Sequence, residues 1–201
     1  MIWWQPLYPA TVPMLSAIIA THESERALVP TLSALVPAVT TGLLREVIVA
    51  DAGSRDATAE VAEIAGCRFM SSTEPLGARL SAAVTATRTP WLLFLHAGTV
   101  PAPGWTTSAE HFMQSANLAN RPRAAVFRKT TDALQPSLKE VFGLLRAALG
   151  GAPSPRQGLL ISRRAYDAVG GYNPAEDADM ALLRRLGRRR ITMLASGATI
   201  T

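Results

Sequence analysis

The chain has 201 residues, 48% of them hydrophobic and 17% charged, which is typical of one compact domain and excludes a disordered or fibrous chain. The one cysteine, Cys67, excludes an internal disulfide framework, and the three histidines show no zinc-site spacing, so a reducing, cytoplasmic compartment is expected. The 20 basic and 15 acidic residues give a formal net charge of +5, which favours anionic partners.

Residues 1–13 are apolar but carry three prolines and no basic stretch, so we predict an extended leader rather than a signal peptide. Residues 14–201 are predicted to form a single domain. Nowhere do about 18 apolar residues follow one another without interruption, so no membrane-spanning helix is expected. Peripheral contact with the inner face of a membrane stays open.

Short β-rich runs alternate with helical patterns from Leu15 onward, and this alternation predicts an α/β fold with a parallel sheet. In chain order, the expected strands are 16–20, 46–50, 67–71, 91–95, 124–128 and 159–162, and strand-like runs follow at 190–201. The expected helices are 24–38, a segment that Ser54 and Asp56 cap and Gly66 ends, 78–87, 106–117 and an amphipathic stretch at 137–149.

Two of these helices carry further expectations. Pro30 should lie in the first turns of its helix or kink it. Ile64 should lie on the apolar side of the helix after Asp56, together with Val61 and Ala62. The amphipathic stretch 137–149 is predicted to be a buried helix, with a membrane-surface helix as the alternative.

Ligands of open α/β sheets bind beyond the carboxyl ends of the strands. The side chains expected there are Thr21 and Glu23, Asp51, and the run from His96 to Thr99. Asp51 could accept hydrogen bonds from a base or a ribose, with Gly53 letting the ligand approach the backbone next to Ser54. The alternative is an Asx turn that only supports the following helix.

Two clusters of charge lie near the end of the sequence. Glu176 and Asp177 either stabilise a helix N-terminus or supply a general base. The arginine cluster is either a solvated helix end or a contact for phosphate or lipid headgroups, and it comprises Arg184, Arg185, Arg188, Arg189 and Arg190. Nucleic acid is not an expected partner, because these arginines lack the interleaved aromatic residues on which bases stack.

Six segments occur in the order found in family 2 glycosyltransferases: SAIIATHESE, EVIVADAGSRDAT, PLGARLSAA, WLLFLHAGTVP, LLISRRAYDAVGGYNP and EDADMALLRRLGRR. The chain resembles the compact bacterial branch of that family over nearly all of residues 14–195. This resemblance implies a GT-A fold, a Rossmann-like and mostly parallel sheet flanked by helices. It also implies a nucleotide-diphosphate sugar lying across the strand ends, with a divalent ion on its phosphates.

The resemblance also assigns roles to single residues. Thr21 and Glu23 correspond to positions that contact the nucleotide, and Asp51 corresponds to the base-binding aspartate. Arg79 lies in the segment that flanks the donor. Asp177 corresponds to the acid that deprotonates the acceptor hydroxyl, with Glu176 beside it.

The segment LHAG occupies the place of the family's metal-binding DXD motif, with His96 and Gly98 where acids are expected. A divalent cation, manganese or magnesium, is therefore doubtful, and His96 is the one remaining candidate ligand. Arg79 and Arg156 could offset part of the diphosphate charge instead. Other departures from the family pattern are Ala52, Ala57, Ser81 and Ala83.

The leading hypothesis is a hexosyltransferase-like enzyme that moves a sugar from a nucleotide-diphosphate donor to an acceptor hydroxyl, with inversion. The alternative is a non-catalytic nucleotide-sugar-binding or scaffold protein that kept the GT-A fold. A dinucleotide-dependent oxidoreductase is disfavoured, because the turn THESE after the first strand has no GxGxxG phosphate cradle. The acceptor is open, and a lipid-linked acceptor is one candidate.

Overall fold

The structure is a computed structural model that describes residues 14–130, 155–174 and 178–201. The predicted leader 1–13, the amphipathic stretch 137–149 and the acids Glu176 and Asp177 lie outside the described residues. No helix among the described residues has the length and apolar character needed to cross a bilayer.

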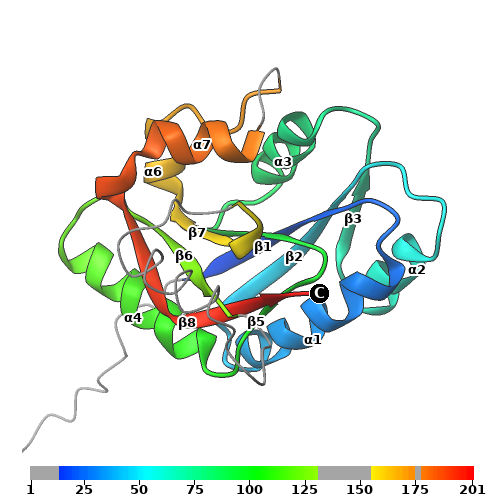
Figure 1. Ribbon diagram of the computed structural model, residues 1–201, viewed down its shortest axis with the longest axis horizontal. Coiled ribbons are helices and arrows are strands. Elements are labelled where there is room, and N and C mark those ends of the chain that lie inside the picture. The colour runs from blue at the N-terminus through cyan, green and yellow to red at the C-terminus, as the bar shows by residue number, and fades with distance from the viewer. Residues whose placement is uncertain (1–13, 131–154, 175–177) are drawn as a thin grey trace, which may run out of the picture.

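The first half of the chain forms parallel β-α units, as expected (Figure 1). Its strands pair in the order β3-β2-β1-β4, all parallel. They are β1 (Leu15–Thr21), β2 (Leu44–Asp51), β3 (Arg68–Ser71) and β4 (Trp91–His96). The helices between them are α1 (Glu25–Thr40), α2 (Thr58–Ile64) and α3 (Leu76–Thr85).

The second half extends the sheet beyond β4 and makes it mixed. The strand order continues as β4-β7-β6-β8-β5, with β7 antiparallel to both of its neighbours and β6 parallel to β8. These strands are β5 (Thr99–Pro101), β6 (Ala124–Lys129), β7 (Leu159–Ser162) and β8 (Ile191–Ile200). The helices are α4 (Trp105–Leu118), α6 (Arg163–Ala168) and α7 (Ala178–Leu186), with 3-10 turns η1 (Pro155–Gln157) and η2 (Arg188–Arg190).

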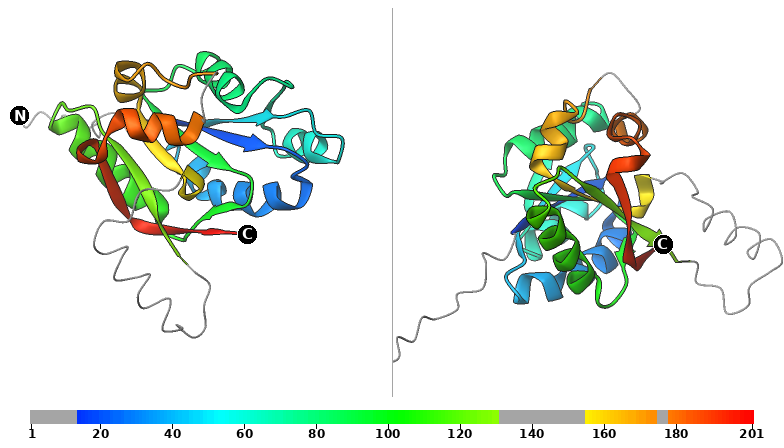
Figure 2. Two further views of the ribbon diagram at one scale, coloured as in Figure 1. Left: turned by 45° about the horizontal axis from the view of Figure 1, so that its top comes forward. Right: turned by 90° about the vertical axis from the view of Figure 1, so that its left-hand side faces the viewer.

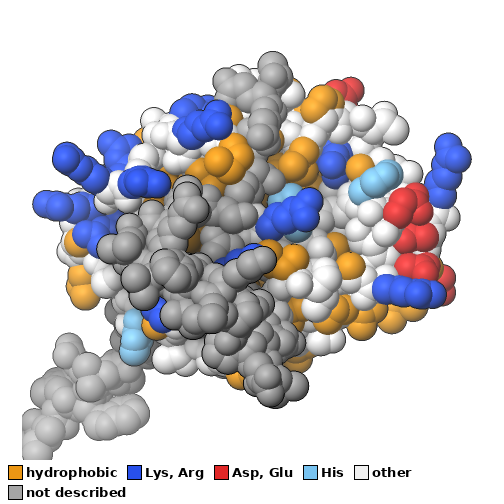
Figure 3. Space-filling model, in the orientation of Figure 1, with side chains coloured by type: hydrophobic (Ala, Val, Ile, Leu, Met, Phe, Trp, Pro, Cys, Tyr) orange, Lys and Arg blue, Asp and Glu red, His pale blue; other side chains and the backbone are white. Residues whose placement is uncertain are grey.

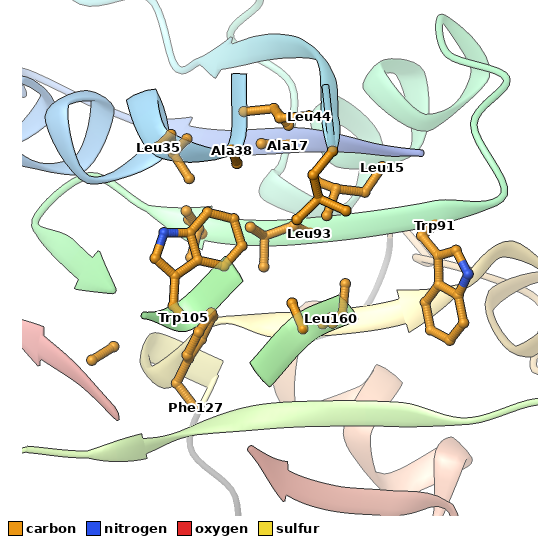
Figure 4. Close-up of a cluster of buried hydrophobic side chains, with 14 of the residues drawn as sticks. Leu15, Ala17, Leu35, Ala38, Leu44, Trp91, Leu93, Trp105, Phe127 and Leu160 are labelled. Carbon is orange, nitrogen blue, oxygen red and sulfur yellow. The ribbon is translucent and has the colours of Figure 1, made fainter. Parts of the chain in front are cut away.

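The sheet is covered on both faces, which explains why its central strands are continuous apolar runs. Leu93 faces α1 and α4 in a cluster with Trp105 and Phe127 (Figure 4). Phe94, the next residue of β4, points to the opposite face and packs on Tyr166 and Tyr172 beside α3, α6 and α7. Figure 2 shows these two helix layers on opposite sides of the sheet.

Pro30 lies in the second turn of α1, which continues through it and through Pro37. One local expectation is wrong. The side chain of Ile64 is 80% exposed rather than packed on the sheet, because α2 ends there and its buried residues are Thr58 and Ala62.

Gly98, between β4 and β5, anchors the end of the last strand. Its φ of +88° is one that L side chains rarely adopt. Its N–H donates to the Ala27 carbonyl and to Thr31 Oγ1, each at 3.0 Å, and its carbonyl accepts from the Thr201 N–H at 2.9 Å. A Cβ on Gly98 would lie 2.7 Å from the Thr201 carbonyl oxygen. A glycine is therefore required where β8 meets this turn.

We predict that Gly98→Ala destabilises the fold more than Gly42→Ala. Gly42 has a similar φ of +74° but nothing within 4 Å of an added Cβ, so its substitution costs only the backbone strain, about 1 kcal/mol. The contact with Thr201 should add about 1–3 kcal/mol for Gly98→Ala. Urea unfolding of both variants measures the difference, and equal losses would show that Thr201 does not press on this turn.

Candidate functional site

A pocket of about 340 Å³ opens at the carboxyl ends of β1 and β4, where the topology of an α/β sheet places ligands. It brings together residues singled out from the sequence, namely Thr21, Arg79, Arg156 and, from the run 96–99, His96, Ala97 and Thr99. Ile200 and Thr201 of the last strand also line it. The described parts of the chain therefore place residues as far apart in sequence as Thr21 and Thr201 around one cavity.

Asp51 is a fully buried carboxylate that accepts a hydrogen bond from Thr21 beside this pocket, but it is not among the residues that line the pocket. Its Oδ2 accepts from the N–H groups of Gly53 (2.8 Å) and Ser54 (2.7 Å) and from Ser71 Oγ (3.1 Å). Its Oδ1 accepts from Thr21 Oγ1 (2.8 Å) and Ser54 Oγ (2.5 Å). The two bonds from Gly53 and Ser54 form an Asx turn, the alternative that the sequence left open.

The electrostatics of Asp51 follow from these bonds. Burial alone would raise the pKa of its carboxyl, but the hydrogen bonds from Ser54, Thr21 and Gly53 outweigh burial and hold the pKa below the ordinary value of 3.8. The group is thus an anion at neutral pH, with five donors around its two oxygens.

The loops after β1 and β2 are joined by reciprocal hydrogen bonds. The Glu23 N–H donates to Ser54 Oγ at 2.8 Å, and Glu23 Oε1 accepts from the Arg55 N–H at 2.8 Å. Two residues after Glu23, the Glu25 N–H donates to Asp56 Oδ2 at 3.0 Å. Glu23 has a positive φ of +47°, which these bonds hold in place. The predicted residues Glu23, Gly53 and Ser54 therefore build the loop beside the pocket.

The side chain of Arg79 extends from α3 to the carboxyl end of β2. Its guanidinium donates to the Ala50 carbonyl at 2.5 Å and to the Glu74 carbonyl at 3.2 Å, which fixes its position. Burial lowers the pKa of Arg79 and the nearby Asp51 charge opposes that shift, but an arginine stays protonated in proteins. Arg79 therefore brings a fixed positive charge to the pocket.

The other cationic side chain of the pocket comes from η1. Thr99 Oγ1 in β5 donates to the Arg156 carbonyl at 3.1 Å and so anchors η1 at the pocket rim. The Arg156 side chain is exposed. His96, the last residue of β4, pairs in register with Ala20 of β1. Guanidinium and imidazole groups thus line the pocket from two sides.

The described lining of the pocket does not fit a hard divalent ion. It offers hydroxyls, the imidazoles of His22 and His96 and two guanidinium groups, and it includes no Asp or Glu side chain. The described residues also contain no group of three or more His, Cys, Asp or Glu side chains placed to share a metal. Magnesium and manganese prefer oxygen ligands such as carboxylates, whereas arginines attract anions. The chemistry of this donor set favours a diphosphate.

Sequence reasoning missed the two C-terminal residues of the pocket, Ile200 and Thr201. They reach it because β8 pairs with β5 across about a hundred residues of chain, with Ile200 opposite Thr99. No local pattern signals such a pairing. Ser71, a further donor to Asp51, was missed for the same reason, since it arrives from the neighbouring strand β3.

We predict that Asp51→Asn lowers the free energy of unfolding at pH 7 by about 1–3 kcal/mol, because an amide nitrogen would then face buried hydrogen-bond donors. The folded pKa of Asp51 lies below its unfolded value, so its contribution is complete above pH 3.8 and is lost as pH falls through the folded pKa. The gap between wild type and variant should therefore shrink in acid.

Urea unfolding at pH 7 and at pH 3 measures this gap. Asp167→Asn, at an exposed position of α6, is the matched control and should change the free energy of unfolding little at either pH. A gap between wild type and Asp51→Asn that is unchanged in acid would mean that the carboxylate charge does not hold these loops.

Solved structures with the same fold are known. The glucosyl-3-phosphoglycerate synthase of Mycobacterium tuberculosis, in complex with Mn²⁺, UDP and glucosyl-3-phosphoglycerate, superposes with a TM-score of 0.65 at 21% identity, over 90% of this chain and 69% of that one. Its complex with Mn²⁺, UDP-glucose and phosphoglyceric acid gives 0.64 at 20% identity, over 90% and 69% of the two chains. A further mycobacterial protein gives 0.63 at 21% identity, over 94% and 65%.

At this identity the structures show the fold alone, which is the GT-A fold expected from the sequence. No curated protein is similar enough in sequence to be matched. The sequence profile of glycosyl transferase family 2 matches residues 16–148, which include β1 to β4, the Asp51 loop and Arg79. The chain therefore belongs to glycosyl transferase family 2.

Proposed function

We propose that this protein transfers a sugar from a nucleotide-diphosphate donor to an acceptor hydroxyl, with inversion at the anomeric carbon. The observation that carries this proposal is the pocket at the strand ends of a family 2 fold, lined by Arg79, Arg156 and His96. The structural neighbours bind UDP or UDP-glucose, which fits a donor of this class.

In the proposed reaction, the acceptor oxygen attacks the anomeric carbon in line with the bond to the diphosphate. The new glycosidic bond forms as the bond to the leaving phosphate oxygen breaks, and the nucleotide diphosphate departs with the electron pair. Asp177, with Glu176 beside it, takes the proton of the acceptor hydroxyl as general base. The positive groups of the pocket stabilise the leaving diphosphate.

We further propose that binding of the donor depends weakly or not at all on a divalent ion. A pair of unit charges about 4 Å apart is worth roughly 4 kcal/mol at an effective dielectric of about 20, so Arg79 and Arg156 offset part of the diphosphate charge. A guanidinium group can also donate two parallel hydrogen bonds to the oxygens of one phosphate. Complexes of the glucosyl-3-phosphoglycerate synthase contain Mn²⁺, so this property would distinguish the chain from that enzyme.

The second candidate is a nucleotide-sugar-binding protein without transferase activity. It is favoured by the absence of a carboxylate among the described pocket residues and by Gly98, which stands where the family has an acid. Restoring that acid is not a clean test, because any side chain at position 98 meets Thr201. Turnover by the unchanged protein separates the two candidates directly.

We predict that the protein releases nucleotide diphosphate from at least one of a panel of UDP-, GDP- and TDP-sugars, and that Asp177→Asn lowers this rate by about 10²–10⁴-fold. The dissociation constant for the donor should stay within about twofold, because a general base contacts the acceptor. Asp167→Asn serves as the control. Unchanged turnover in Asp177→Asn would remove this residue from the mechanism, and donor binding without turnover in the wild type would favour the second candidate.

We also predict that calorimetry finds similar donor affinity with manganese and with EDTA, while Arg156→Gln weakens binding about tenfold in both, as expected for loss of a charged hydrogen bond of roughly 1.5 kcal/mol. Arg55→Gln is the control, since Arg55 is exposed and lies outside the pocket lining. Donor binding that appears only with manganese would refute the proposed role of the arginines.

A further inference from the structure

A group of arginines lies at the end of the sheet opposite the pocket at the carboxyl ends of β1 and β4, which we call the donor pocket. We call this group of arginines the basic pole and define it by Arg121, Arg123, Arg164, Arg184, Arg188, Arg189 and Arg190. In Figure 3 a group of Lys and Arg side chains lies over the side where Figure 1 shows α6 and α7, and most acidic side chains in view lie on the other side near α2, next to further basic ones. On this face, acidic side chains are therefore sparse around the basic pole.

Separate segments of the chain converge at the basic pole. Ala124 pairs with Ile191 at the start of β6 and β8, which brings Arg123 beside Arg190. The Ser162 N–H donates to the Arg123 carbonyl at 3.1 Å. Arg164 donates to Asn120 Oδ1 at 2.6 Å and so joins α6 to the end of α4. The charges are thus held by the fold and do not belong to one helix end.

The structure divides the arginine cluster seen in the sequence. Arg185 donates to the Val169 carbonyl at 3.0 Å and to the Gly171 carbonyl at 2.6 Å, so it holds the segment after α6 in place. Arg184 and the three arginines of η2 are exposed. These four side chains contribute to the basic pole. Arg185 is exposed as well, but its guanidinium is held by the two carbonyls and so has a structural role.

A small pocket of about 100 Å³ lies within the basic pole. Arg121 and Arg164 line it together with Asn117, Asn120 and Ser162. Two guanidinium groups with amide and hydroxyl side chains form the kind of lining that binds a single phosphate group. Trp91 lines this pocket and His96 lines the donor pocket, so the two pockets lie at opposite ends of β4.

An aliphatic side chain projects beside these arginines. Leu118, the last residue of α4, is 89% exposed and precedes Arg121 by three positions. Ile64, the last residue of α2, is also largely exposed, but it lies on a helix that carries Glu60 and Glu63. An apolar side chain among cations is characteristic of peripheral membrane contacts, where the apolar group enters the interface and the cations meet the headgroups.

We propose that the basic pole binds the surface of an anionic phospholipid membrane. In this arrangement Leu118 enters the interface, and the pocket between Arg121 and Arg164 takes one headgroup phosphate. The donor pocket then faces away from the bilayer, about 17 Å further along β4 by the strand rise. Nucleic acid is the less fitting partner, because the side chain that projects here is aliphatic, whereas bases stack on aromatic rings.

The test is sedimentation of the full chain with vesicles of phosphatidylcholine alone or mixed with phosphatidylglycerol, at low and high salt. We expect binding to the anionic vesicles only, weakened by salt. Arg188→Glu combined with Arg189→Glu should lower the partition coefficient at least tenfold, since each arginine near an anionic surface contributes roughly fivefold. Leu118→Ser should lower it several-fold.

Matched variants control for net charge and for exposed apolar area. Arg26→Glu combined with Arg55→Glu changes the charge by the same amount at exposed positions away from the basic pole and should retain binding. Ile64→Ser controls for Leu118→Ser. Equal loss of binding in the two double variants, or a larger loss in Ile64→Ser, would overturn the proposal. Binding of a nucleic-acid duplex or of inorganic phosphate, without vesicle binding, would overturn it as well.

Discussion

The buried carboxylate of Asp51 is the interaction on which the strand-end region depends. It accepts hydrogen bonds that originate in β1, in the loop after β2, and in β3, so one anion holds the carboxyl ends of three neighbouring strands in register. A buried charge is tolerated only when donors surround it, and here five do. Both oxygens are engaged by donors of the protein itself, and the guanidinium groups that line the neighbouring pocket come from Arg79 and Arg156.

The rim is fixed by contacts between segments far apart in the chain. Glu23 and Ser54 lock the first two loops to each other, and Gly98 docks the end of β8 through its backbone. Each contact removes freedom from a loop before a ligand arrives, which favours a preorganised site. Glycine at position 98 is therefore explained by packing, whatever its consequence for metal binding.

The sequence predicted the parts of the fold that depend on local patterns. The strands at 91–95 and 159–162 were predicted from apolar runs, and they correspond to β4 and β7. The order of the β-α units was predicted from the alternation of strand-like and helical patterns. Long-range pairing was not predictable in this way, so the approach of Ile200 to the pocket was missed. The exposure of Ile64 was missed because the helical pattern extends past the point where α2 ends.

The charged side chains near the pocket differ in orientation, and the amino-acid composition alone does not show this. Glu23 and Glu25 lie close to the strand-end pocket, but their carboxylates accept from the N–H groups of Arg55 and Ala57 and are thus turned into the loop. Arg79 is fixed by backbone carbonyls beside the cavity, and carbonyl oxygens do not neutralise its charge. The local field therefore favours an anion even though acids and bases both surround the site. Arg185 keeps its charge in the same way, but its hydrogen bonds to the Val169 and Gly171 carbonyls hold its guanidinium on the segment after α6.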